Sequence, residues 1–215
     1  MSNATLSNAS MEAQSDIWGG GVRPYSVGSR KLGMWLFIVS DSLTFSAMLV
    51  TYSYMRLANG ANWPTPFHLW PSLVVASIMT FCLLSSSLTM VLAVEAGHQG
   101  RRADAAKWIY LTIAGGVAFI LLHANEWRML IHEGMKPFEN PWGSPLFGAT
   151  FFACTGLHML HVTVGVIYLA FVAVMFKRGR ISGTDVEVSG LYWHFVDLVW
   201  MFIFPMIYLM STKIS

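Results

Sequence analysis

Three pairs of ionisable side chains lie inside long apolar runs, and each pair is spaced three residues apart. The pairs are His123 with Glu126, His158 with His161 in the stretch GLHMLHV, and His194 with Asp197. Residues i and i+3 share a face of a helix, so each pair is expected to project from one side of a helix. Imidazoles and carboxylates at this spacing are typical ligands of haem iron or of a carboxylate-bridged di-metal centre. A metal site is therefore the first hypothesis to test.

Such a metal site needs ligands from different helices at one depth. Counted from the expected inner end of each span at about 1.5 Å per residue, Glu126 lies at about 28 Å, His158 at about 27 Å and His194 at about 6 Å. On the same count Asp41 lies at about 13 Å and Asp197 at about 10 Å. The polar groups therefore divide into an outer and an inner cluster. We predict that the chain has no metal ligand and no catalytic residue.

The outer cluster is interpreted as an interhelical polar clamp, and a metal held by the same groups is the alternative. A carboxylate opposite an imidazole satisfies both groups in a low dielectric, where an unpaired charge is costly. We predict that Glu126 pairs with His158 across two helices. The residues of the predicted clamp are His123, Glu126, His158 and His161.

The inner cluster consists of Asp41 and the stretch LYWHFVDLVW, residues 191 to 200. Aromatic rings with a polar tip favour the headgroup level of a membrane, and cations at that depth meet phosphates. We expect contacts with lipid phosphate or with a partner subunit, and ordinary anchoring is an equal alternative. The residues expected to make these contacts are Arg30, Lys31, Tyr192, Trp193, His194 and Asp197.

Asp41, in FIVSDSLTF, is the acidic residue of the first apolar run and has no charged residue three or four positions away. A buried carboxyl of this kind either stays protonated or faces a partner outside the chain. Both states are compatible with proton exchange as well as with simple burial.

The elements that position these residues are long apolar segments. Of the 215 residues, 55% are hydrophobic and 11% are charged, which is too little charge for a soluble globular protein. Runs of about 20 apolar residues are long enough to cross a bilayer. We therefore predict an all-α membrane protein, a bundle of five transmembrane helices. The expected spans are 32 to 56, 70 to 95, 107 to 130, 146 to 176 and 190 to 212, with Pro205 bending the last one.

Lysine and arginine near span ends favour the cytoplasmic side. One side of the predicted bundle has nine such residues and the other has four, which are Arg56, Arg128, Lys136 and Lys213. The amino terminus is therefore predicted to be cytoplasmic and the carboxyl terminus to lie on the outer side. Residues 1–31 are predicted to be a flexible cytoplasmic tail, and residues 32–215 the five-helix domain. The small net charge of +2 argues against a nucleic-acid partner.

Four segments, in order, resemble subunit III of the haem-copper oxidases. They are GMWLFIVSDSLTF (33 to 45), HANEW (123 to 127), FFACTGLHMLHVTVG (151 to 165) and YWHFVDLVWMFIF (192 to 204). The number of spans is similar to the five-span bacterial form of the family. The resemblance therefore implies a multi-pass protein of the bacterial inner (cytoplasmic) membrane.

The resemblance implies a non-redox accessory subunit of a respiratory oxidase, most directly cytochrome c oxidase, which reduces oxygen to water and pumps protons. It implies that haem and copper are bound by partner subunits and that this chain contacts subunit I, with subunit II in the same complex. It also implies structural phospholipids in a cleft between the helices. Asp41 stands where the family usually has a membrane-buried glutamate facing subunit I, and Glu126 matches a carboxylate of the family.

Alternatives remain for the function. The five-span form also occurs in quinol oxidases, so the electron donor is either cytochrome c or a quinol. A stand-alone proton or ion transporter would use Asp41, Glu126 and the histidines as a relay, which the division into two clusters disfavours. A membrane cytochrome would bind haem in the isolated chain.

Overall fold

Long apolar segments fold into helices here because a helix satisfies its own backbone hydrogen bonds, as a bilayer requires. The computed structural model describes residues 28–212. Backbone contacts divide the chain into two units, Met1–Asp41 and Ser42–Ser215, which are described separately. The described part of the first unit is the beginning of one helix. The long helices are α2 (Ser29–Asn59), α3 (Val74–His98), α4 (Arg102–His132), α5 (Leu146–Lys177) and α6 (Gly183–Ile203).

Short helical turns extend three of these helices, α2, α3 and α6. Over the described residues, five helical segments are long and apolar enough to cross a membrane, which confirms the predicted all-α bundle of five spans. The orientation of the termini stays a prediction, and most of the predicted tail lies outside the described residues. The short elements are η1 (Gly60–Asn62), the π-helical turns η2 (Leu69–Leu73) and η3 (Phe204–Tyr208), and η4 (Leu209–Ser211).

The last span begins earlier than the expected residue 190 because of a capping box. The Ser182 amide and hydroxyl both donate to Asp185 Oδ2, at 2.9 and 2.8 Å. This pairing satisfies free donors at the helix start, so α6 extends through a polar first turn. At its other end the α-helix gives way to a π-helical turn that contains Pro205, the disturbance expected of a proline.

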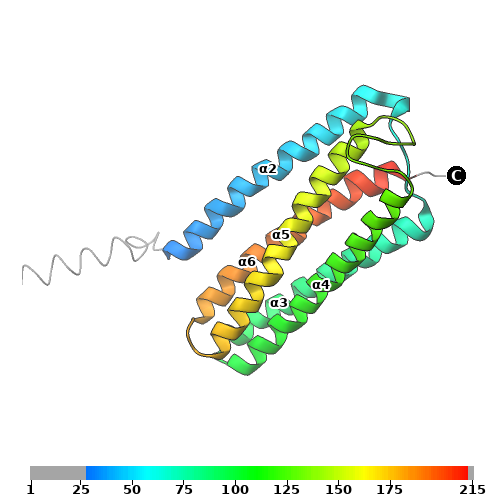
Figure 1. Ribbon diagram of the computed structural model, residues 1–215. Coiled ribbons are helices and arrows are strands. Elements are labelled where there is room, and N and C mark those ends of the chain that lie inside the picture. Colours follow the sequence, from blue (N-terminus) through cyan, green and yellow to red (C-terminus); the bar gives the residue numbers. More distant parts are fainter. Residues whose placement is uncertain (1–27, 213–215) are drawn as a thin grey trace, which may run out of the picture. The chain divides into compact units, whose positions relative to one another are not determined.

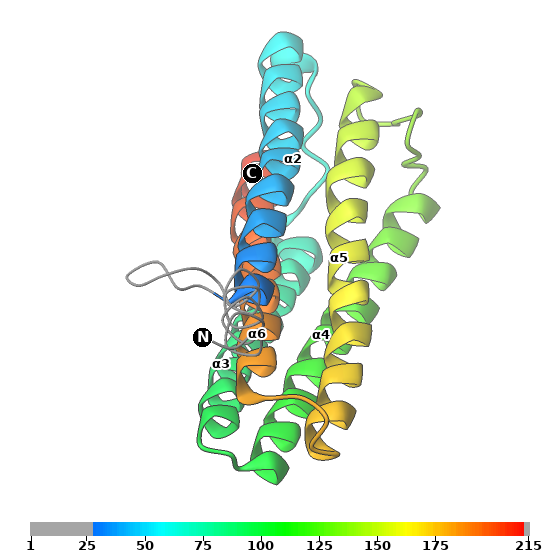
Figure 2. The same ribbon diagram turned by 90° about the vertical axis from the view of Figure 1, so that its left-hand side faces the viewer.

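Helices α3, α4, α5 and α6 form a ring in the second unit. Helix α3 packs against α4 and α6, and α5 packs against the same two neighbours; Figures 1 and 2 show the four lying side by side. The turn between α3 and α4 and the turn between α5 and α6 each contain a glycine with φ of 71°, Gly100 and Gly179. A left-handed residue at this point ends a helix and reverses the chain within a few residues.

The loop between α4 and α5 is held against the start of α5. A Cβ built on Gly148 would lie 2.4 Å from the Lys136 carbonyl oxygen, so this glycine allows the loop to pack directly on the helix. Within the loop, Lys136 Nζ lies 2.6 Å from Glu139 Oε2. The hydrogen bond and the positive charge of Lys136 lower the pKa of Glu139.

The backbones of α3 and α6 approach closely where α6 begins. A Cβ on Gly183 would lie 2.6 Å from the Gly97 carbonyl oxygen, which is closer than any packed side chain tolerates. We predict that Gly183→Ala lowers the free energy of unfolding by about 1–3 kcal/mol, because the two backbones must move apart. Denaturant unfolding in mild detergent measures this change. The control is Thr184→Ala, an exposed position one residue along the same helix, and equal stability of the two variants would contradict the close contact.

Candidate functional site

Two buried histidines of the outer cluster contact Trp200 of α6. The rings of His123 (α4) and His158 (α5) lie 5.6 and 5.1 Å from the Trp200 ring, centroid to centroid. Phe119 lies against both imidazoles, at 5.5 and 5.6 Å. All four side chains are fully buried. Aromatic packing, which is favourable at these separations, therefore brings the two histidines into one cluster.

Glu126, one turn after His123 on α4, is paired within this cluster. The hydroxyl of Tyr208, in the π-helical turn η3, donates to Glu126 Oε2 at 2.7 Å. His123 Nδ1 lies 3.2 Å from the same oxygen, but its geometry does not make a hydrogen bond. The carboxyl therefore links α4 to the end of the last span.

The predicted pair of Glu126 with His158 is wrong. Neither ring nitrogen of His158 has a hydrogen-bond partner among the described residues, and its ring stacks on Trp200 instead. The partner across the helices is Tyr208, which the sequence reasoning missed because it considered ionisable groups only. A hydroxyl at the end of the last apolar run was the available signal. Tyr208 lies in the π-helical turn that contains Pro205, and its side chain is buried.

The two histidines of GLHMLHV have different neighbours. His161 Nδ1 contacts the Leu157 carbonyl oxygen of its own helix at 2.8 Å, and its ring lies edge-on to Phe45 of α2 at 5.3 Å. His158 faces Trp200. Within residues 28–212, no three His, Cys, Asp or Glu side chains form a group able to hold a metal ion.

Helices α3 and α6 are joined by side-chain hydrogen bonds along their length. Serine and threonine of α3 meet indole or imidazole groups of α6 in each case. The contacts are Trp200 Nε1 to Thr80 Oγ1 at 2.9 Å, Trp193 Nε1 to Ser86 Oγ at 3.0 Å, and Ser87 Oγ with His194 Nδ1 at 2.6 Å. The hydroxyls of α3 are therefore the partners of the inner cluster.

Two residues expected to contact lipid or a partner lie inside the bundle. Trp193 is 1% exposed and Tyr192 is 6% exposed, and the Tyr192 hydroxyl donates to the His161 carbonyl oxygen at 3.0 Å. Their rings fill the space beside Gly165, where an added Cβ would be crowded. The expectation of surface contacts at these two positions is corrected: a large ring next to a glycine packs helix to helix.

The remaining predicted residues differ in how far they are buried. His194 is half-buried and Asp197 is 7% exposed, with Asp197 Oδ1 lacking a hydrogen-bond partner among the described residues. Arg30 and Lys31 lie in the first turn of α2, and Asp41 lies within the same helix. These three belong to the first unit.

These features define an integral membrane protein whose buried polar groups connect helices. The sequence matches the family described as "Cytochrome c oxidase subunit III" over residues 11–212. The chain therefore belongs to the cytochrome c oxidase subunit III family. Members of this family are subunits of multisubunit respiratory oxidases.

Several bacterial proteins are similar along most of their length. The chain is 33% identical over 192 residues to cytochrome bo(3) ubiquinol oxidase subunit 3 of Pseudomonas aeruginosa, covering 87% of this chain and 88% of the relative. It is 32% identical over 184 residues to cytochrome c oxidase subunit 3 of Alkalihalophilus pseudofirmus, covering 84% and 86%. It is 32% identical over 210 residues to quinol oxidase subunit 3 of Bacillus subtilis, covering 95% and 94%.

The pairing of Glu126 with Tyr208 predicts energetic coupling between these two residues. We expect Glu126→Gln and Tyr208→Phe to be non-additive in unfolding free energy by about 0.5–3 kcal/mol, because each change removes the same contact. The matched cycle combines Glu126→Gln with His158→Phe, and we expect less coupling there because the two side chains share no hydrogen bond. Thermal or denaturant unfolding in mild detergent gives both values. Larger coupling to His158 than to Tyr208 would contradict the observed pairing.

Proposed function

We propose that this chain is subunit III of a cytochrome c oxidase in the bacterial inner membrane, with its amino terminus in the cytoplasm. The complex would reduce oxygen to water and pump protons, with haem and copper held by partner subunits. The chain itself would be a non-redox scaffold that contacts subunit I and binds phospholipid. Its membership of the subunit III family and the relatives named cytochrome c oxidase subunit 3 support this proposal.

A quinol oxidase is the second candidate for the complex. Relatives named as subunits of ubiquinol or quinol oxidases are as similar to this chain as those of cytochrome c oxidases. The difference concerns the electron donor, which acts on the complex and not on this chain. A stand-alone transporter is less well supported, since the relatives that this chain resembles are named as subunits of oxidases.

The observation that carries the scaffold proposal is the loose attachment of α2. The closely packed helix pairs of the second unit all lie among α3, α4, α5, α6 and their extensions. Residues 42–59 of α2 reach the ring through individual side chains. Phe45 contacts His161 at 5.3 Å and Phe195 at 6.4 Å, and the Tyr52 hydroxyl lies 2.8 Å from Ser211 Oγ.

Two apolar cavities lie beside residues 42–59 of α2. The cavity toward α6 and the cavity toward α5 each have a volume of about 180 Å³. Hydrocarbon is the filling expected for an apolar opening at membrane depth, since water is excluded there. These cavities support the proposal that phospholipid chains occupy a cleft beside α2. The lining residues are Ser42, Phe45, Ser46, Leu49, Phe195, Leu198, Val199 and Phe202 toward α6, and Ala47, Met48, Thr51, Thr150 and Ala153 toward α5.

An exposed apolar stripe on α2 supports contact with a neighbouring subunit or with lipid. Leu43, Val50, Tyr54 and Leu57 are 69%, 67%, 66% and 81% exposed, and their spacing places them on one face of the helix. We propose that subunit I covers this helix. Asp41 is proposed as the carboxyl facing subunit I, and His194, Asp197, Arg30 and Lys31 as contacts for lipid or a partner.

Filling the cavity toward α6 should displace lipid. We expect the complex carrying Leu49→Trp and Leu198→Trp to retain fewer phospholipids and to lose activity faster during turnover, because the indole rings occupy the space of acyl chains. Native mass spectrometry and the time course of oxygen consumption measure these effects. Leu121→Trp, at a 65% exposed position of α4, is the control. An unchanged lipid count in the double variant would contradict lipid occupancy.

The accessory role is tested by removing this chain from the purified oxidase. We expect initial oxygen consumption to persist while the activity decays within fewer turnovers, since redox centres remain but their support is lost. Assays with reduced cytochrome c and with a quinol, run in parallel on the intact complex, identify the electron donor. Full and sustained turnover without the chain would contradict the scaffold role.

A further inference from the structure

The buried Glu126 carboxyl belongs to a residue that lines a cavity. The residue is 6% exposed, and its Oε2 accepts the Tyr208 hydrogen bond. Its Oε1 is buried and has no hydrogen-bond partner among the described residues. An unpaired carboxyl oxygen in a low-dielectric interior is costly whether the group is charged or neutral. A ligand that both donates and accepts hydrogen bonds would satisfy it in either state.

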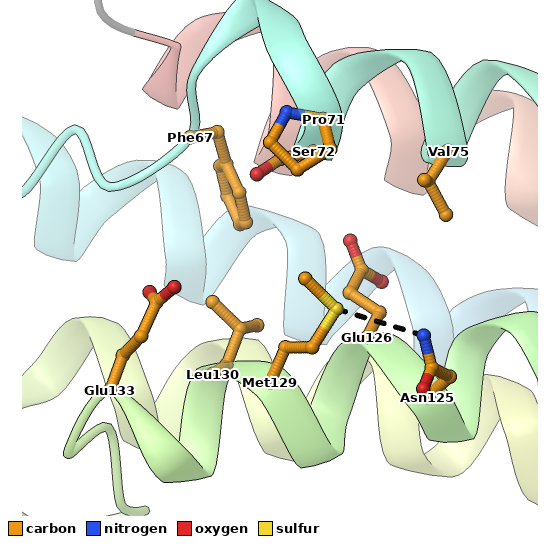
Figure 3. A pocket seen from close by; sticks show the side chains of 9 residues that line it. All are labelled: Phe67, Pro71, Ser72, Val75, Asn125, Glu126, Met129, Leu130 and Glu133. Atoms are coloured by element: carbon orange, nitrogen blue, oxygen red, sulfur yellow. Dashed lines mark hydrogen bonds between the residues drawn. The ribbon is translucent and has the colours of Figure 1, made fainter.

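The cavity that Glu126 lines lies between α4 and the beginning of the span that contains α3. Figure 3 shows the Glu126 carboxyl pointing away from α4 toward the segment that carries Ser72 and Val75. Phe67 and Met129 form part of the wall, and the exposed Glu133 lies two helical turns after Glu126. The cavity has room for a water molecule, which needs about 10–15 Å³, and polar groups line it. Water is therefore the occupant that fits this site.

The groups around Glu126 would hold the carboxyl in place as its charge changes. Tyr208 donates to Oε2 in the neutral and in the ionised form. The other titratable groups near this pair are His123 of the same helix, and His158 and Cys154 of α5. Arg128 is engaged by the Asn125 side chain at 2.9 Å. Among the described residues, the α3 segment lines the cavity with the hydroxyl of Ser72 and no ionisable side chain.

We propose that Glu126 is a proton-binding site that exchanges with water through this cavity, at the end of the bundle that carries the loop 133–145. In the exchange the Oε1–H bond breaks, its electron pair stays on Oε1, and the proton passes to a cavity water that gives hydronium. The ionised carboxyl then accepts hydrogen bonds from water and Tyr208. The site is a local one, formed by the Glu126 carboxyl and the Tyr208 hydroxyl. The inference needs the fold and not the proposed scaffold role in the oxidase.

Infrared difference spectroscopy of the purified oxidase complex tests the proposal. Between acidic and alkaline buffer we expect a band of a protonated carboxyl that disappears in Glu126→Gln and shifts in Tyr208→Phe. In D₂O the wild-type band should shift within seconds to minutes, because the carboxyl exchanges its proton with water from the cavity. The proposal would be overturned if Glu126→Gln kept every pH-dependent carboxyl band of the wild type. It would also be overturned if the wild-type band failed to respond to D₂O.

A second pair of variants keeps the test decisive if Glu126→Gln does not assemble. Ser72→Leu fills the cavity without changing the carboxyl, and we expect it to slow the deuterium shift at least tenfold. Ser77→Leu is the matched control, since Ser77 is exposed, lies in the same span and does not line the cavity. Equal exchange rates in the two serine variants would show that the cavity is not the route and would overturn the proposal. Preserved oxygen consumption in these variants would leave the proposed subunit function unaffected.

Discussion

Hydrogen bonds between α3 and α6 organise the ring of helices. In a bilayer, apolar surface alone gives helices no preferred partner, so small residues and polar contacts decide the packing. Thr80 lies about two turns before Ser86 and Ser87, and Trp200 lies the same distance after Trp193 and His194. Because the two helices run in opposite directions, these hydrogen bonds align along one interface. They set the register of the last span and therefore the positions of the residues that follow it.

The buried polar cluster depends on this register. Trp200, whose indole is held by Thr80, is the surface on which His158 stacks and against which His123 packs. Two turns further along the span, Tyr208 reaches Glu126. The cluster therefore joins α4, α5 and the end of the last span. Its chemistry is that of hydrogen bonding and proton exchange, and no redox role is required of it.

Helix α2 is attached in a different way from the other four. Within the second unit, the contacts of α2 include those of Phe45 and Tyr52, which are buried. Apolar cavities lie beside them. A helix held by a few bridging aromatic rings leaves room for lipid, whereas a helix joined by close backbone contacts does not. This contrast between a tight ring and a bridged helix suits a subunit that binds lipid beside a larger partner.

The sequence by itself determined the class of protein, the helical segments and the family. Apolar length predicts spans reliably because the bilayer imposes it, and four ordered motifs identify the family. The choice of partners was decided by the tertiary structure. Glu126 was expected to meet His158 because both are ionisable and lie at one depth, but depth along a helix does not specify rotation about its axis. The register of α6, the π-helical turn at Pro205 and glycines such as Gly165 decided that Tyr208 reaches the carboxyl and that Trp193 is buried, because these positions depend on contacts between residues far apart in the chain.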